Sequence, residues 1–284
     1  MFILIPIFLL CIITILLVCR KVLGDGDKIL DIKPINFIKM DVNVENNAKY
    51  TAIIIEPRPH KALEFVLNNF LENLSSDWNI IVFHGNRNMD FVNDIVNIKL
   101  NKYITRIKLI NLNIDDLSIQ EYSHIFYNPD FYNLIPTEIF LVFQTDTIIC
   151  SKYKDLIYDF IKYDYVGAPW TSIFDNKGSN VGNGGLSLRK KSKSIEILDK
   201  CNLESECYKT ILCDSEDLIM SKTHLNNCSS INIYKPSNDE AKNFAIETVK
   251  NDKSFGIHKP WKYINIDYMK DWCPDVFTLK KLNK

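Results

Sequence analysis

Short apolar, β-branched runs alternate with segments of amphipathic helical spacing through the first half of the sequence. The runs that predict strands are 50–55, 78–83, 104–110 and 139–143, and the segments that predict helices are 62–74, 89–96 and 118–126. Strands that alternate with helices predict a largely parallel sheet with helices on its faces. Ligands bind beyond the carboxyl ends of the strands in such sheets. The residues after the fourth strand, Gln144-Thr145-Asp146, are therefore expected at a binding site.

The second half of the sequence is less regular. It predicts helices at 153–161, 191–198 and 213–220, strands at 163–166 and 185–188, and loops at 167–182 and 255–261. Apolar residues make up 46% of the 284 residues, enough to bury the core of one large α/β domain.

Residues 1–19 contain no charged side chain, and Arg20 and Lys21 follow directly. As a helix this segment would span about 28 Å, close to the hydrocarbon thickness of a bilayer. We expect an uncleaved membrane anchor here. A cleaved signal peptide and a buried core helix are the alternatives. The polar residues 20–48 are expected to form a stem.

The net charge bears on nucleic acid binding, and the cysteines bear on zinc binding and disulfides. The formal net charge is −1, so the chain lacks the positive excess that a polyphosphate backbone requires, and we expect no nucleic acid partner. Eight cysteines are present without a C-x-x-C pair, which argues against a zinc site. We expect free buried thiols, with disulfides only if the domain lies in an oxidising compartment.

Asp146 is the first candidate for chemistry. A carboxylate after an apolar strand can hold a divalent cation that bridges the two phosphates of a diphosphate and neutralises a leaving group. The alternative is that Asp146 caps the next helix. The segment Val181–Arg189 is more specific, since its glycines allow close backbone approach to a ligand. The alternative there is a glycine-rich hairpin turn.

Three further segments carry candidate side chains. Glu216 and Asp217 begin a predicted helix and are candidate bases, although acidic residues also favour helix starts through the macrodipole. His258 is a candidate metal ligand and Lys259 a candidate phosphate ligand, although a histidine in a loop is often incidental. The candidate acceptor-binding aromatics are Tyr165, Trp170 and Trp261, and core packing is the alternative for them.

Nine segments between Ala52 and Trp261 together resemble a glycosyltransferase-like domain family with members in fungi, bacteria and large DNA viruses. They are IIEPR, the amphipathic helix, FHG, EYS, FQTD, YDYVGAPW, VGNGGLSLR, EDL and FGIHKPW. That family is similar to GT-A glycosyltransferases. The resemblance implies a GT-A-like, Rossmann-type mixed sheet flanked by helices. It also implies one domain over 49–284, with a nucleotide-binding half at 49–150 and an acceptor half at 151–284.

The resemblance also implies roles for individual residues. Asp146 matches the last Asp of the D-x-D motif that holds Mn²⁺, and Gln144 stands in the first position, a departure from the motif. His258 resembles the metal-binding histidine and Lys259 the diphosphate-binding lysine of glycogenin-like enzymes. Glu216 and Asp217 are similar to the acidic pair that deprotonates the acceptor in inverting galactosyltransferases.

We therefore expect transfer of a sugar from a nucleoside-diphosphate sugar, UDP-linked, to a hydroxyl acceptor on a glycan or protein, assisted by a divalent cation, Mn²⁺. Asp217 is the first candidate for the base and Glu216 the second. The expected donor-binding residues are Asp146, Gln144, Asn183, Gly184, Gly185 and Lys259. Anchored glycosyltransferases usually face the lumen, whereas the basic pair after residue 19 favours a cytosolic domain. An inactive carbohydrate-binding or scaffold protein and a nucleotidyltransferase are the rival interpretations.

Overall fold

The computed structural model describes residues 35–37, 48–171, 180–201, 215–221 and 231–284. The chain divides into two units, Met1–Lys33 and Pro34–Lys284, and all of the described residues belong to the second. The predicted anchor at 1–19 and most of the predicted stem lie outside the described residues. Within the described residues, no helix has the length and apolar character needed to cross a membrane.

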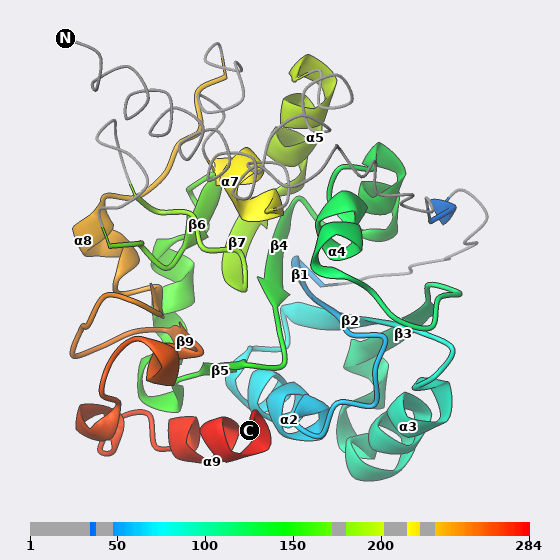
Figure 1. The fold of residues 1–284 in the computed structure, drawn as a ribbon, viewed down its shortest axis with the longest axis horizontal. Helices are drawn as coiled ribbons and strands as arrows, with labels where there is room; N and C mark the ends of the chain where they lie inside the picture. The colour runs from blue at the N-terminus through cyan, green and yellow to red at the C-terminus, as the bar shows by residue number, and fades with distance from the viewer. Residues whose placement is uncertain (1–34, 38–47, 172–179, 202–214, 222–230) are drawn as a thin grey trace, which may run out of the picture. The chain divides into compact units, whose positions relative to one another are not determined.

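Six strands of the described residues form one mixed sheet in the order β3-β2-β1-β4-β7-β6 (Figure 1). Their bounds are β1 Tyr50–Ile55, β2 Trp78–His84, β3 Ile107–Asn111, β4 Ile139–Phe143, β6 Tyr165–Gly167 and β7 Leu186–Lys190. The first four strands are parallel, as predicted, and β7 runs antiparallel to both β4 and β6. The amino end of β7 therefore lies at the same edge as the carboxyl ends of β1 and β4.

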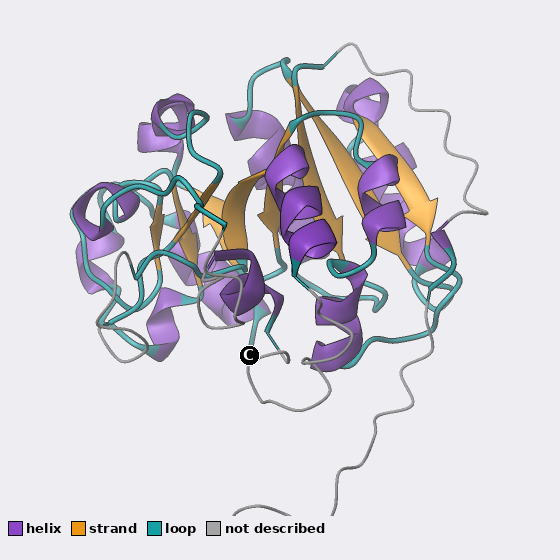
Figure 2. Ribbon diagram, turned by 90° about the horizontal axis from the view of Figure 1, so that it is seen from above, coloured by secondary structure: helices purple, strands orange, loops and turns teal. Residues whose placement is uncertain are grey.

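Helices cover both faces of this sheet (Figure 2). Their bounds are α2 Leu63–Asn73, α3 Met89–Asp94, α4 Ile119–Ile125, α5 Lys191–Lys200, α7 Glu216–Ser221, α8 Asn238–Ala241 and α9 Asp275–Leu282. The side chains of β1 contribute to an apolar cluster on each face of the sheet, because successive side chains of a strand point to opposite faces. Ala52 and Ile54 belong to one buried apolar cluster, and Ile53 and Ile55 belong to the other.

A second, three-stranded sheet has the order β5-β9-β8 and consists of β5 Thr147–Ile149, β9 Gly256–His258 and β8 Ala245–Ile246. Strand β9 is antiparallel to β5, which places His258 opposite Thr147. The predicted loop at 255–261 is therefore wrong at its start. The apolar Ile257 is fully buried, and the ladder with β5 satisfies backbone groups that a loop would expose to water.

Two other local predictions need correction. The segment predicted as a helix at 153–161 is a 3₁₀-helix over Ser151–Asp159 with a kink at Tyr153. Tyr153 has non-helical backbone angles, φ −123° and ψ 19°, which interrupt a regular α-helix there. The strand predicted from residue 104 begins at Ile107, because Asn101–Arg106 forms a 3₁₀-helix.

The expectation of free thiols is also wrong for three cysteines. Cys150, directly after β5, and Cys273, which Pro274 separates from α9, form a disulfide with a sequence separation of 123 residues. Cys201 is disulfide-bonded as well. The Cys150–Cys273 bond ties the C-terminal helix to the small sheet that carries His258.

Candidate active site

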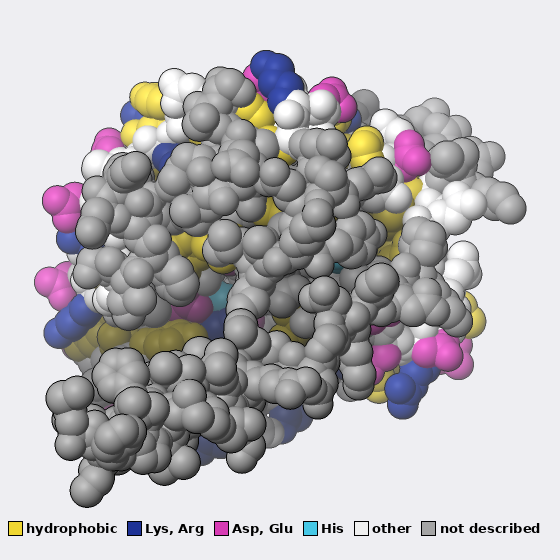
Figure 3. Space-filling model, turned by 45° about the horizontal axis from the view of Figure 1, so that its top comes forward, with side chains coloured by type: hydrophobic (Ala, Val, Ile, Leu, Met, Phe, Trp, Pro, Cys, Tyr) yellow, Lys and Arg dark blue, Asp and Glu magenta, His cyan; other side chains and the backbone are white. Residues whose placement is uncertain are grey.

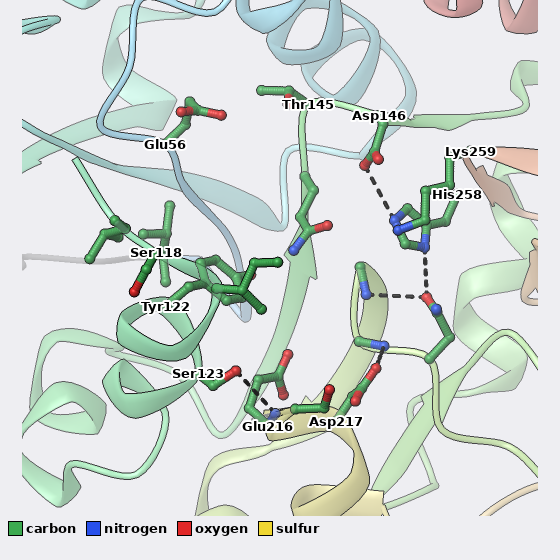
Figure 4. A pocket seen from close by; sticks show the side chains of 18 of the residues that line it. Glu56, Ser118, Tyr122, Ser123, Thr145, Asp146, Glu216, Asp217, His258 and Lys259 are labelled. Atoms are coloured by element: carbon green, nitrogen blue, oxygen red, sulfur yellow. Dashed lines mark hydrogen bonds and ion pairs between the residues drawn. The ribbon is translucent and has the colours of Figure 1, made fainter. Parts of the chain in front are cut away.

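A cavity of about 400 Å³ opens where the carboxyl ends of β1 and β4 meet the starts of α4, β7 and α7 (Figure 4). The segments that line it come from six parts of the chain: 55–58, 117–123, 144–146, 183–185, 215–217 and 258–259. This is the edge at which the sequence places a ligand site. Lys, Arg, Asp and Glu side chains are interspersed around the visible described surface of one face (Figure 3), in keeping with the net charge of −1.

Asp146 and His258 face each other at one end of the cavity (Figure 4). The distance from Asp146 Oδ1 to His258 Nε2 is 3.3 Å. That contact lacks hydrogen-bond geometry, so both atoms are buried without a hydrogen-bond partner. Burial opposes ionisation of Asp146, but His258 and Lys259 outweigh it and lower the pKa of Asp146 to about 2. An ionised carboxylate oxygen and a ring nitrogen at this spacing suit two adjacent ligands of one divalent cation.

A buried network fixes the ring of His258. Its Nδ1 lies 2.8 Å from Asn183 Oδ1 and 3.2 Å from Glu247 Oε1, and Asn183 donates to Glu247 Oε2 at 2.7 Å. Acceptors on the Nδ1 side assign the proton to Nδ1 in the neutral ring and direct the Nε2 lone pair toward Asp146. Burial disfavours the charged ring, but Asp146 and Glu247 outweigh it and raise the pKa of His258. The prediction missed Glu247, although it follows β8 as Asp146 follows β4.

Lys259 lines the same end of the cavity. Its backbone adopts a left-handed conformation with φ 37°, and its N–H donates to the Asp146 carbonyl at 3.0 Å. Its Nζ lies 3.9 Å from Glu247 Oε1, and its side chain is 23% exposed. The β5–β9 pairing thus brings a carboxylate, an imidazole and an ammonium group, predicted from two distant segments, to one place.

Within the described residues, no three His, Cys, Asp or Glu side chains converge as a metal cage. The two orphaned buried atoms of Asp146 and His258 nevertheless fit a divalent cation that takes its other ligands from a diphosphate and water, a common arrangement for Mg²⁺. Gln144 lines the cavity beside them. Its side chain is neutral, so it brings no second carboxylate.

Asp217 lies at the opposite end of the cavity (Figure 4). Its Oδ2 accepts a hydrogen bond of 3.0 Å from the Gly184 amide. Burial, with a contribution from the neighbouring Glu216 charge, raises the pKa of Asp217 to about 7. A carboxylate that titrates near neutral pH and borders a cavity is suited to proton transfer.

Glu216, the second candidate base, has its carboxylate engaged in a buried ion pair. Both of its carboxylate oxygens accept from Arg189, at 2.7 and 3.1 Å, and the two side chains are buried. Because this bidentate ion pair occupies the carboxylate, Glu216 is a structural partner of Arg189. The sequence indicated the segment Val181–Arg189 as a specific motif but did not predict a partner for Arg189.

Three of the residues expected at the donor line the cavity, and the three aromatic residues expected at the acceptor are absent from the lining. Asn183, Gly184 and Gly185 line the cavity, and Tyr165, Trp170 and Trp261 do not. Tyr165 is buried, and its hydroxyl donates to the Gly182 carbonyl. A Cβ at Gly182 would meet the Trp170 ring, so that ring packs against the glycine loop. Core packing, the alternative for these aromatics, is therefore correct for Tyr165.

The prediction missed another charged pair at the cavity. Glu56, at the end of β1, is buried, and its carboxylate accepts from Arg58 Nε at 2.8 Å and from Arg58 Nη2 at 3.0 Å. Asn88 donates to the carbonyls of both residues and so fixes the turn. The EPR sequence directly after the first strand carried this signal.

The fold and the cavity define a mixed α/β protein with a cavity lined by polar side chains at the carboxyl ends of its central strands. The chain belongs to the family described as "Protein of unknown function (DUF5672)", whose sequence profile matches residues 106–258, more than half of the chain. No curated protein sequence matches it.

Solved glycosyltransferase structures show a distant likeness. The apo form of the glycosyltransferase GlyE of Streptococcus pneumoniae TIGR4 matches with a TM-score of 0.46 and 14% identity, over 77% of this chain and 55% of that one. TarS 1–349 of S. aureus in complex with UDP matches with a TM-score of 0.45 and 12% identity, over 81% of this chain and 64% of that one. The chain thus spans less than two thirds of either structure, and likeness at this level carries no argument about function.

Proposed function

We propose that the chain is a glycosyltransferase that moves a sugar from a nucleoside-diphosphate sugar, UDP-linked, to a hydroxyl acceptor. One observation carries the proposal. The facing Asp146 and His258 atoms, with Lys259 beside them, stand at one end of a cavity whose other end holds Asp217, a carboxylate with a pKa near 7. Cation ligands and a base across one cavity are the two parts that sugar transfer from a diphosphate needs.

The donor diphosphate belongs at the Asp146 end of the cavity. Asp146 and His258 would hold a divalent cation, Mn²⁺ in this proposal, and the bound cation would neutralise the diphosphate leaving group. Lys259 adds positive charge next to the same group and so favours its departure. A Cβ on Gly184 would clash with Glu216 and Asp217, and one on Gly185 would clash with His258, so glycine lets the backbone lie against these side chains of the site.

The acceptor hydroxyl belongs beside Asp217. In the proposed step the acceptor oxygen bonds to the anomeric carbon while the bond from that carbon to the diphosphate oxygen breaks. The hydroxyl proton passes to Asp217, and the electron pair of the broken bond leaves with the diphosphate. A single displacement of this kind inverts the configuration at the anomeric carbon.

We further propose that residues 1–19 anchor the protein and that the domain faces an oxidising compartment. The disulfide between Cys150 and Cys273 supports this side of the membrane, because disulfides persist in secretory compartments and are rare in the cytosol. The basic pair Arg20-Lys21 favours the opposite side through the positive-inside bias. We give the disulfide more weight, because the charge bias admits exceptions.

The test is the melting temperature of the full chain, purified in mild detergent, with UDP, GDP or CMP, each with and without Mn²⁺. We expect a rise with UDP that requires Mn²⁺ and disappears in Asp146→Ala. Loss of the rise in Asp146→Ala but not in Asp155→Ala, a change on the 3₁₀-helix outside the cavity, would exclude a general effect of lost charge. A rise without Mn²⁺ would keep a nucleotide site and remove the cation from the proposal.

The neutral Gln144 favours one rival, an inactive carbohydrate-binding or scaffold protein, since the D-x-D pattern lacks its first carboxylate. That rival predicts no melting shift with any nucleotide and no release of nucleoside diphosphate from a donor sugar.

A further inference from the structure

Arg189 is a fully buried cation directly beneath the cavity. Its guanidinium lies between the rings of Phe126 and Tyr165, 4.8 and 5.1 Å from their centroids. Its Nη1 and Nη2 donate to the two carboxylate oxygens of Glu216, and its Nε donates to Ser187 Oγ at 2.9 Å. Every nitrogen of the group therefore has a partner, so the charge is fully enclosed and fixed in orientation.

The pair connects three elements that meet at Asp217. Arg189 lies on β7, and Glu216 is the first residue of α7. The Glu216 amide donates to Ser123 Oγ on α4 at 3.3 Å. The Gly184 carbonyl accepts from Ser187 Oγ at 3.0 Å. The buried Arg189–Glu216 ion pair therefore connects the turn before β7 to the start of α7.

Stability alone does not account for such a pair. Desolvation offsets much of the attraction in a buried ion pair, and apolar side chains of similar volume often replace one without loss. The position of this pair is informative, because Glu216 precedes Asp217 in the sequence and the Gly184 amide donates to Asp217. A Cβ on Gly184 would lie 2.6 Å from Glu216 Oε1 and 2.8 Å from Asp217 Cβ, so the three residues are in close contact.

We propose that Arg189 and Glu216 are positioning residues, which hold the Asp217 carboxylate against the Gly184 amide and set the pH at which Asp217 ionises. The inference rests on the proposed function only where it names Asp217 as the base. Among the described residues, the charged and titratable groups that act on Asp217 are Glu216 on its own helix, Arg189 on β7 and Tyr165 on β6. Burial and Glu216 raise the pKa of Asp217, and Arg189 opposes them.

The pH at which Asp217 ionises can be measured without any turnover. In the unfolded chain an aspartate ionises near pH 3.9, whereas in the folded chain Asp217 does so near pH 7. Between these values the unfolded state releases its proton first, so Asp217 lowers stability progressively as pH rises. The gain in melting temperature from Asp217→Asn should therefore grow with pH and become constant above about pH 7.

The experiment repeats this measurement on the full chain in three further backgrounds. In Glu216→Gln the negative charge is lost and Arg189 is unopposed, so the gain should become constant at least about one pH unit lower. In Arg189→Met combined with Glu216→Leu, which removes both charges, the shift should have the same direction and be smaller. The control is Asp164→Asn, which breaks the Lys190–Asp164 ion pair at the far end of β7. In this background the pH above which the gain becomes constant should stay near 7.

Two outcomes would overturn the inference. One is a gain that becomes constant at the same pH in the wild-type chain, in Glu216→Gln and in the double variant. The other is an equal shift in Asp164→Asn. Should Glu216→Gln not fold, the double variant carries the comparison, because it leaves no unpaired charge. If the shift appears but the wild-type chain turns over no sugar donor, the positioning of Asp217 stands and the proposed transferase function fails.

Discussion

Gly185→Ala tests the role of His258 with the smallest change that the chain offers. A Cβ at Gly185 would lie 2.2 Å from His258 Cε1 and 2.3 Å from Nε2, whereas ordinary contacts begin at 3.4 Å. The ring would have to move by about 1 Å, and a displacement of that size in a catalytic site can reduce the rate by about 10²-fold. The ring cannot move freely, because Asn183 and Glu247 hold its Nδ1.

The assay is the Mn²⁺-dependent part of the melting shift with UDP, followed by initial rates of donor turnover. We expect Gly185→Ala to lose the Mn²⁺-dependent part of the shift and to retain any part that occurs without Mn²⁺. Gly182→Ala is the matched control, since its Cβ would meet Trp170 and Ser221, not His258. An undiminished Mn²⁺ response in Gly185→Ala would refute the assignment of His258 as a ligand.

Three further predictions concern the base, the support of the imidazole and the disulfide. Because the ionised form of Asp217 accepts the proton, kcat/KM should rise with pH and level off above about 7, and Asp217→Asn should lower it at least about 10²-fold, as initial rates from pH 5.5 to 8.5 would check. Glu247→Gln should weaken Mn²⁺ affinity by about 10–100-fold in a calorimetric titration, since it removes the charge that supports His258. Replacing Cys150 and Cys273 by alanine should lower the free energy of unfolding by about 5 kcal/mol because the loop they close is long, and an unchanged melting temperature would contradict this.

The sequence was sufficient where local rules decide the structure. Strands β1 and β4 have the predicted bounds, because apolar β-branched runs ending at turn residues leave little choice of register. The helix predicted over 118–126 is present as α4, and Ser118 and Glu121 form a capping box at its start. Asp146 could be assigned to the cavity for a similar reason, since a parallel strand fixes the edge at which its carboxyl end lies.

The sequence was insufficient where a distant segment supplies the partner. Nothing near His258 shows that residues 256–258 form a strand, because the pairing partner β5 lies more than a hundred residues earlier. The disulfide between Cys150 and Cys273 is hidden for the same reason, since spacing along the chain says nothing about proximity over such a distance.

Adjacent residues with the same charge can have opposite roles, as Glu216 and Asp217 show. Both stand at the start of α7, where the helix dipole favours either carboxylate, so local sequence cannot separate them. Arg189 separates them, because its planar group matches both oxygens of Glu216, whereas Asp217 Oδ2 accepts from the Gly184 amide. Burial, with the neighbouring Glu216 charge, raises the pKa of Asp217 to about 7. The surroundings of the proposed base are therefore set by several elements together, which is why the acidic motif alone left two candidates.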